Sequence, residues 1–107
     1  MEKLPLTEPV LLILLSLAAE PRHGYSILKD VDQMSGGRVV LSTGTLYGAL
    51  RRLLEEGWIE RLEQKDASRG KQAYRLTARG RGNLHSEVGR LKQLVRLGSL
   101  RIATREY

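Results

Sequence analysis

The chain has 107 residues, enough for one domain with a buried core, and its many leucines, with no Phe and one Trp, favour packed helices over a β-sandwich. It has no cysteine, which excludes a disulfide framework and a thiolate metal site and leaves the cytoplasm as the expected compartment. The net charge of +6 is uneven, because residues 1–57 carry −1 (six Lys/Arg, seven Asp/Glu) and residues 58–107 carry +7 (twelve and five), which favours a polyanionic partner.

The first predicted helix begins at an N-cap on Thr7, runs to about Ala19 and is almost entirely apolar. Lys3 followed by this apolar run imitates a signal peptide. Against that interpretation, Glu2 and Glu8 cancel the positive flank, and the run is too short to span a bilayer. We therefore expect a buried first helix and no membrane association.

Two more helices follow in close succession. The second is predicted over His23–Ser35 and is closed by Gly36-Gly37; its three- and four-residue spacing turns four apolar residues inward, namely Ile27, Leu28, Val31 and Met34. Ser42 can cap the third, which stops at Gly57. Four leucines share the inward face of this third helix: Leu46, Leu50, Leu53 and Leu54.

A basic hairpin comes next. Trp58–Gln64 and Gln72–Leu76 have the composition of short strands, and the polar turn Lys65–Lys71 joins them. Three helices and a basic hairpin predict a mostly α (α+β) fold, a winged helix-turn-helix with a two-stranded wing over residues 1–77.

Residues 78–107 are predicted to form one long C-terminal helix capped by Thr77. Its apolar positions repeat at spacings of four and three along a heptad seam: Leu84, Val88, Leu91, Val95, Gly98 and Ile102. The seam either clasps the first helix or pairs two chains. We expect a homodimer whose interface contains five of these residues, namely Leu84, Val88, Leu91, Val95 and Ile102.

The third helix has the composition of a DNA-recognition helix, whose first turns need short polar donors with an aromatic or basic residue behind them. The candidates are Ser42, Thr43, Thr45, Tyr47 and Arg51. Three of them, Thr43, Tyr47 and Arg51, are expected to project opposite the inward leucines. The alternative is a capping turn with a solvated face. Gly44 and Gly48 are costly within a helix, so we expect them to allow close approach either to DNA or to the second helix.

The hairpin tip would meet the DNA backbone or the adjacent minor groove with three cations, Lys65, Arg69 and Lys71. A solvated loop is the alternative. Lys29 and Tyr25 on the second helix can add phosphate contacts, although Tyr25 can equally be a half-buried packing residue.

An enzyme is not expected. His23 and His85 have no neighbouring His, Cys or carboxylate cluster at ligand spacing, so we expect no catalytic residues, no metal and no cofactor.

Several motifs, each weak alone, form a specific combination. They are Leu6-Thr7 to Leu17, His23-Gly24-Tyr25, Gly44-Thr45-Leu46-Tyr47 with Leu50, Arg52-Leu53, Gly57 and Ile59, and Tyr74-Arg75-Leu76-Thr77 with Gly80. In this combination the chain resembles the PadR-like bacterial transcriptional regulators over about residues 4–82. The resemblance implies a homodimeric repressor, often relieved by a small molecule. It assigns contact with double-stranded DNA to the basic wing and to Tyr25, Ser42, Thr45 and Tyr47.

Two departures from the family pattern are visible. Thr43 stands where relatives often have Pro, and the C-terminal part is a single helix, as in the short branch of the family. Some short relatives bind flat aromatic drugs at a tryptophan in that helix, but residues 83–107 contain none, so no multidrug pocket is expected. The alternative function is a protein-interaction module that binds an acidic partner and forms a coiled coil.

Overall fold

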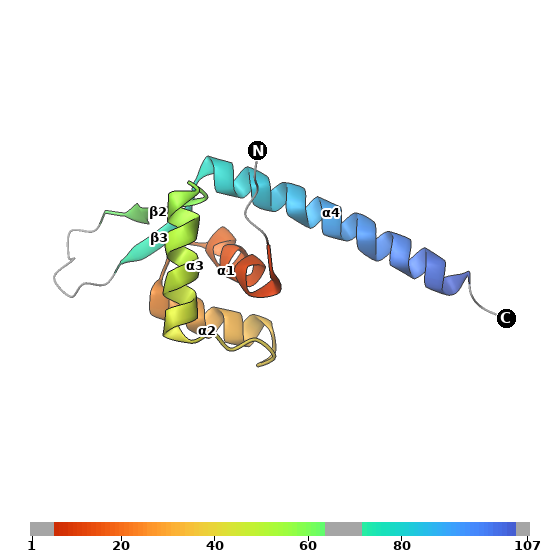
Figure 1. Ribbon diagram of the computed structural model, residues 1–107, viewed down its shortest axis with the longest axis horizontal. Helices are drawn as coiled ribbons and strands as arrows, with labels where there is room; N and C mark the ends of the chain where they lie inside the picture. The colour runs from red at the N-terminus through yellow and green to blue at the C-terminus, as the bar shows by residue number, and fades with distance from the viewer. Residues whose placement is uncertain (1–5, 64–71, 105–107) are drawn as a thin grey trace.

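The computed structural model describes residues 6–63 and 72–104 of the chain. In chain order the elements are α1 (Glu8–Ala19), β1 (Arg22–His23), α2 (Gly24–Met34), α3 (Thr43–Glu55), β2 (Ile59–Leu62), β3 (Ala73–Leu76) and α4 (Ala78–Ala103). Three helices and a small sheet form a rounded body, and α4 extends from it as a free arm (Figure 1). The molecule is accordingly elongated, with extents of 64 × 33 × 21 Å.

Side-chain caps begin three of the four helices in the described part of the chain, as predicted. The hydroxyls of Thr7, Ser42 and Thr77 accept hydrogen bonds from the backbone N–H three residues later, at 3.4, 3.1 and 3.0 Å. Each bond satisfies an N–H that the helix itself cannot pair. The second helix begins at Gly24 instead of His23, because His23 pairs with Ala73 as part of a strand.

The sheet has three antiparallel strands in the order β1-β3-β2, one more than the predicted two-stranded wing. Arg22 pairs with Tyr74 along β1, and Ile59 pairs with Leu76 along β2. A two-residue strand is too short to show an alternating pattern in the sequence, so β1 was not predicted. The strands β2 and β3 fall within the bounds predicted for them. The expected turn Lys65–Lys71 lies outside the described residues.

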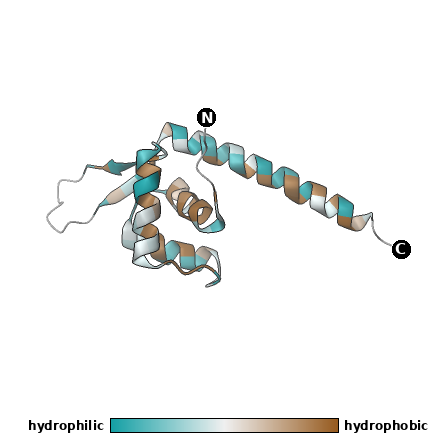
Figure 2. Cartoon of the chain, viewed as in Figure 1, coloured by the Kyte–Doolittle hydropathy of each residue, from teal (hydrophilic) through white to brown (hydrophobic). Residues whose placement is uncertain are grey.

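The core is aliphatic, as the composition indicated, and α1 lies at its centre against α2, β3 and α4. Figure 2 shows α1 as hydrophobic along its length. The fully buried large side chains come from all three short helices and β2: Ile13, Leu14, Leu17, Ile27, Val31, Leu46, Leu50, Leu53 and Ile59. The predicted inward faces are therefore confirmed, except that Leu28 and Leu54 are half-buried and Met34, the last residue of α2, is exposed.

Among residues 6–63 and 72–104, no helix is both long enough and apolar enough to cross a bilayer.

Candidate nucleic-acid interface

α3 turns its leucines into the core and leaves a polar face exposed. Thr43, Thr45 and Arg51 are exposed on that face. The Ser42 hydroxyl accepts from the Thr45 N–H and donates to the Thr45 side-chain oxygen at 3.0 Å. Ser42 is thus engaged in capping, and its hydroxyl also orients that of Thr45.

Gly44 and Gly48 also lie on the exposed side of α3. Apart from its own stretch of helix, no described atom lies within 4 Å of where a Cβ of Gly48 would stand, and a Cβ of Gly44 would meet only the Ser42 oxygen, at 4.0 Å. The explanation that these glycines allow close packing against α2 is therefore wrong. Along this strip the helix presents bare backbone to its surroundings.

Tyr47 is directed sideways toward α2, not straight outward as the helical spacing suggested. A Cβ on Gly24 would stand 2.3 Å from the Tyr47 hydroxyl oxygen and 2.9 Å from the ring carbon that carries it. The missing side chain of Gly24 thus makes room for the end of the phenol. Tyr47 is still 46% exposed, so its ring can touch a partner as well as α2.

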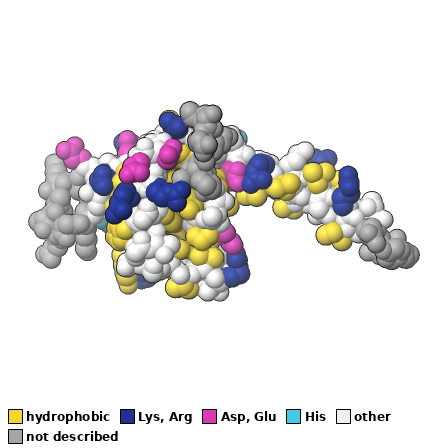
Figure 3. Space-filling view, in the orientation of Figure 1, with side chains coloured by type: hydrophobic (Ala, Val, Ile, Leu, Met, Phe, Trp, Pro, Cys, Tyr) yellow, Lys and Arg dark blue, Asp and Glu magenta, His cyan; other side chains and the backbone are white. Residues whose placement is uncertain are grey.

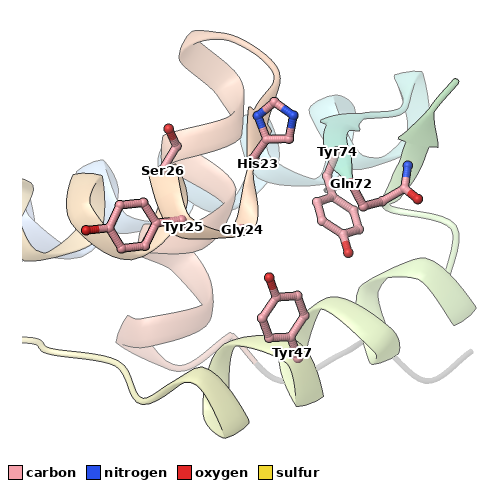
Figure 4. Close-up of a pocket in the computed structure, with 7 residues that line it drawn as sticks. All are labelled: His23, Gly24, Tyr25, Ser26, Tyr47, Gln72 and Tyr74. Carbon is pink, nitrogen blue, oxygen red and sulfur yellow. The ribbon is translucent and has the colours of Figure 1, made fainter. Parts of the chain in front are cut away.

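A pocket of about 380 Å³ opens between the start of α2, α3 and the start of β3. Its lining contains no Lys, Arg, Asp or Glu and consists of His23, Gly24, Tyr25, Ser26, Tyr47, Gln72 and Tyr74. Figure 4 shows Tyr47 and Tyr74 directing their hydroxyls toward the same space. Burial raises the pKa of the Tyr74 phenol, and the neighbouring Tyr47 raises it further, against an opposing effect of Arg61. The Tyr74 hydroxyl therefore stays protonated and able to donate at neutral pH.

Tyr25 is 70% exposed, so the alternative that it is a half-buried packing residue is wrong. The Lys29 ammonium lies 5.5 Å from the centre of the Tyr25 ring, within range of a cation–π contact. The two side chains form one exposed cationic and aromatic feature on α2.

The cations of the wing tip, Lys65, Arg69 and Lys71, lie outside the described residues. At the base of the wing, Arg75 donates to the Glu60 carboxylate at 2.8 Å, and Arg61 is exposed. The Arg75 charge is thus largely offset within the chain.

The predicted seam on α4 divides into two parts. Leu84 is buried in the core of its own chain, and Val88 packs against that core. Farther along, Leu91 is half-buried, and Val95 and Ile102 are 68% and 73% exposed. Hydrophobic side chains recur along α4 toward its free end (Figure 3).

Sequence reasoning missed three exposed leucines on this arm: Leu94, Leu97 and Leu100. They lie off the strict heptad seam, and a count of apolar residues on the free half of the helix, without the heptad restriction, would have found them.

No group of three or more His, Cys, Asp or Glu side chains that could hold a metal occurs in residues 6–63 and 72–104.

Comparison with known proteins gives consistent results. The family model described as "Transcriptional regulator PadR-like family" matches residues 13–86. An uncharacterized 37.1 kDa protein in transposon TN4556 of Streptomyces fradiae is 39% identical over 84 residues, which cover 78% of this chain and 23% of that protein. The chain thus spans less than a quarter of that relative's length.

Two solved structures share the fold. A PadR family transcription regulator from Clostridium difficile R20291 superimposes with a TM-score of 0.74 at 22% identity, covering 90% of this chain and 99% of that one. Bacillus subtilis PadR in complex with operator DNA gives a TM-score of 0.63 at 24% identity, covering 78% of this chain and 47% of that one. At these identities the likeness establishes a winged-helix fold.

Proposed function

Since this chain belongs to the PadR-like family of transcriptional regulators, we propose that it binds double-stranded DNA sequence-specifically as a homodimer and represses transcription. In this proposal α3 enters the major groove, and the hairpin between β2 and β3 follows the phosphate backbone. Binding to chromosomal DNA would place the protein in the cytoplasm.

The observation that carries the proposal is the bare strip of α3 at Gly44 and Gly48. Each glycine costs a helix about 0.8–1 kcal/mol relative to alanine, and nothing in the described chain uses the space that either one leaves. A helix without side chains on its outer edge can sit deep in a groove. The exposed hydroxyl of Thr43 and the Arg51 guanidinium beside this strip supply hydrogen bonds to base edges or phosphates.

Two further features support contact with DNA. The half-exposed Tyr47 ring can press on a thymine methyl, which adds base discrimination. On α2, Lys29 and Tyr25 are exposed together and can meet a phosphate, as can the wing cations Lys65, Arg69 and Lys71. These cations are part of the net charge of +6 and supply affinity that is independent of sequence.

The free half of α4 supports pairing of two chains. Two of its exposed apolar residues, Val95 and Ile102, continue the same face that Leu84 and Val88 use to cover the core. On α1, the apolar side chains of Leu11, Leu12 and Leu15 are only half-buried, although a helix that is apolar all round is normally enclosed. We propose that the partner's α4 covers both surfaces.

The repressor role, and its relief by a small-molecule effector, are proposed from the family resemblance, and no residue is assigned to an effector. A homodimer would read two inverted half-sites separated by about one helical turn, roughly 34–36 Å.

Selection from a randomised duplex library tests this function. Purified wild-type protein should enrich one sequence with two inverted half-sites, because a two-fold symmetric dimer presents the same α3 surface twice. A pool that remains random after repeated rounds would contradict the proposal. Weak DNA retention combined with tight retention on an acidic polypeptide such as polyglutamate would favour the alternative of a protein-interaction module.

A further inference from the structure

The joint between α4 and the rest of the chain is tightly built. α3 ends at a corner where Gly57 adopts a positive φ of 77° and the Trp58 N–H donates to the Leu53 carbonyl at 2.9 Å. The Trp58 side chain is buried and holds its backbone in place, and α4 must pack against that backbone. The first turn of α4 rests on this corner.

Thr77 and Gly80 make the contact. The Thr77 N–H donates to the Trp58 carbonyl at 3.0 Å, and the Thr77 hydroxyl donates to the Gly57 carbonyl at 2.6 Å. The same hydroxyl oxygen accepts from the Gly80 N–H at 3.0 Å. A Cβ on Gly80 would stand 1.9 Å from the Trp58 carbonyl oxygen, which is backbone and cannot turn aside. The end of α3 and the start of α4 are thereby held in one geometry.

A small change in this geometry would move the far end of α4 by a large distance. From Gly80 to the exposed Ile102 the helix extends about 33 Å at 1.5 Å per residue. A tilt of about 10° at the joint would displace the far end by about 6 Å, more than one base-pair step of roughly 3.4 Å. In a dimer joined through the free half of α4, the joint therefore controls how far apart the two α3 helices stand.

We infer that Thr77 and Gly80 are specificity-determining positioning residues: far from DNA, they select the spacing between the two half-sites by fixing the angle between α3 and α4. The inference rests on the proposed function, since it requires a dimer on DNA.

The test uses duplexes that carry the two selected half-sites at every spacing over one helical turn. Wild type should prefer one spacing. Gly80→Ala and Thr77→Val, which removes the hydroxyl but keeps the shape, should bind that spacing about tenfold more weakly and should shift or broaden the preference. Both variants should still sediment as dimers and should bind a duplex with a single half-site within about twofold of wild type.

Matched controls separate position from general damage. Gly82→Ala lies in the same turn of α4, where a Cβ would meet no described atom within 4 Å, and should behave as wild type. Thr77→Ser keeps the hydroxyl and should retain the wild-type preference for one half-site spacing. If Gly80→Ala does not fold, as judged by circular dichroism, Thr77→Val carries the test.

The outcomes distinguish the two claims. A wild-type protein without any spacing preference would refute the proposed dimeric regulator itself. A wild-type preference that Thr77→Val and Gly80→Ala retain unchanged would overturn the inference about the joint alone. Equal loss of binding to single and paired half-sites would show that the two residues support only the fold, and this also overturns it.

Discussion

Two glycines of this chain lack a side chain for opposite reasons. At Gly80 the backbone of Trp58 occupies the place of a Cβ, whereas at Gly48 that place is open. In the sequence both are equally costly residues inside a predicted helix. Only the packing of the chain shows that the fold requires glycine at position 80 but not at position 48.

Gly48→Ala should therefore separate stability from binding. Alanine should raise the free energy of unfolding by about 0.8–1 kcal/mol, because it favours the helix and meets no neighbour. Affinity for the selected duplex should fall, because the methyl group holds α3 away from the groove. Thermal melting and fluorescence anisotropy on one preparation measure both effects. Gly89→Ala on α4, also in open space, is the control, and a Gly48 variant that binds as tightly as wild type would contradict the close approach.

Tyr47→Ala should narrow the affinity gap between the selected and a random duplex by roughly 1–3 kcal/mol, the usual size of one base-specific interaction. Since the ring also packs over Gly24, melting must be measured in parallel. Tyr47→Phe, which keeps the ring but removes the hydroxyl, shows which part matters. If a well-folded Tyr47→Ala variant keeps the same difference in affinity between the two duplexes, base discrimination would instead come from Thr43, Thr45 or Arg51.

At the scale of elements, the sequence predicted what is local and missed what depends on tertiary contact. The caps at Thr7, Ser42 and Thr77 were identified correctly because a cap is a short-range hydrogen bond. The sideways direction of Tyr47 was missed, because it depends on a glycine in another helix. Likewise, helical spacing alone could not show that the first half of α4 packs on the core while the second half extends away from it into solvent.

The wing should contribute affinity that depends on salt and not on sequence. Arg69→Ala or Lys71→Ala should weaken binding to the selected and the random duplex alike, because these cations are expected to meet phosphates. The slope of log affinity against log salt should fall by about 1 for each phosphate that a subunit no longer neutralises. A titration from low to high salt measures this. Loss of binding to the selected duplex alone would mean that the wing reads bases.

The free half of α4 should hold the dimer together. Val95→Glu combined with Ile102→Glu should give monomers, because both side chains are largely exposed in one chain and would lie buried in the interface. Ser86→Glu combined with Gln93→Glu adds the same charge at exposed positions on the other side of the helix and serves as the control. Analytical ultracentrifugation measures both. A Val95 and Ile102 double variant that remains a dimer would place the interface elsewhere.

At the scale of the whole molecule, an elongated chain 64 Å long carries a polar helix face on a rounded body and an arm with exposed apolar side chains at the other end. In the proposed dimer, the separation of these two surfaces would let pairing and DNA binding occur at the same time without competing for residues. A regulator that reads two half-sites requires such a division. We therefore propose that the activity of this chain is sequence-specific recognition of duplex DNA.

The most direct test is the equilibrium affinity of the wild-type protein for the selected duplex and for a scrambled duplex of the same length and composition. At about 0.15 M salt the selected duplex should bind at least roughly 10³-fold more tightly, as specific sites do for regulators of this kind. Affinity for both duplexes should fall as salt rises. Equal affinities for the two duplexes across the whole salt range would contradict the account.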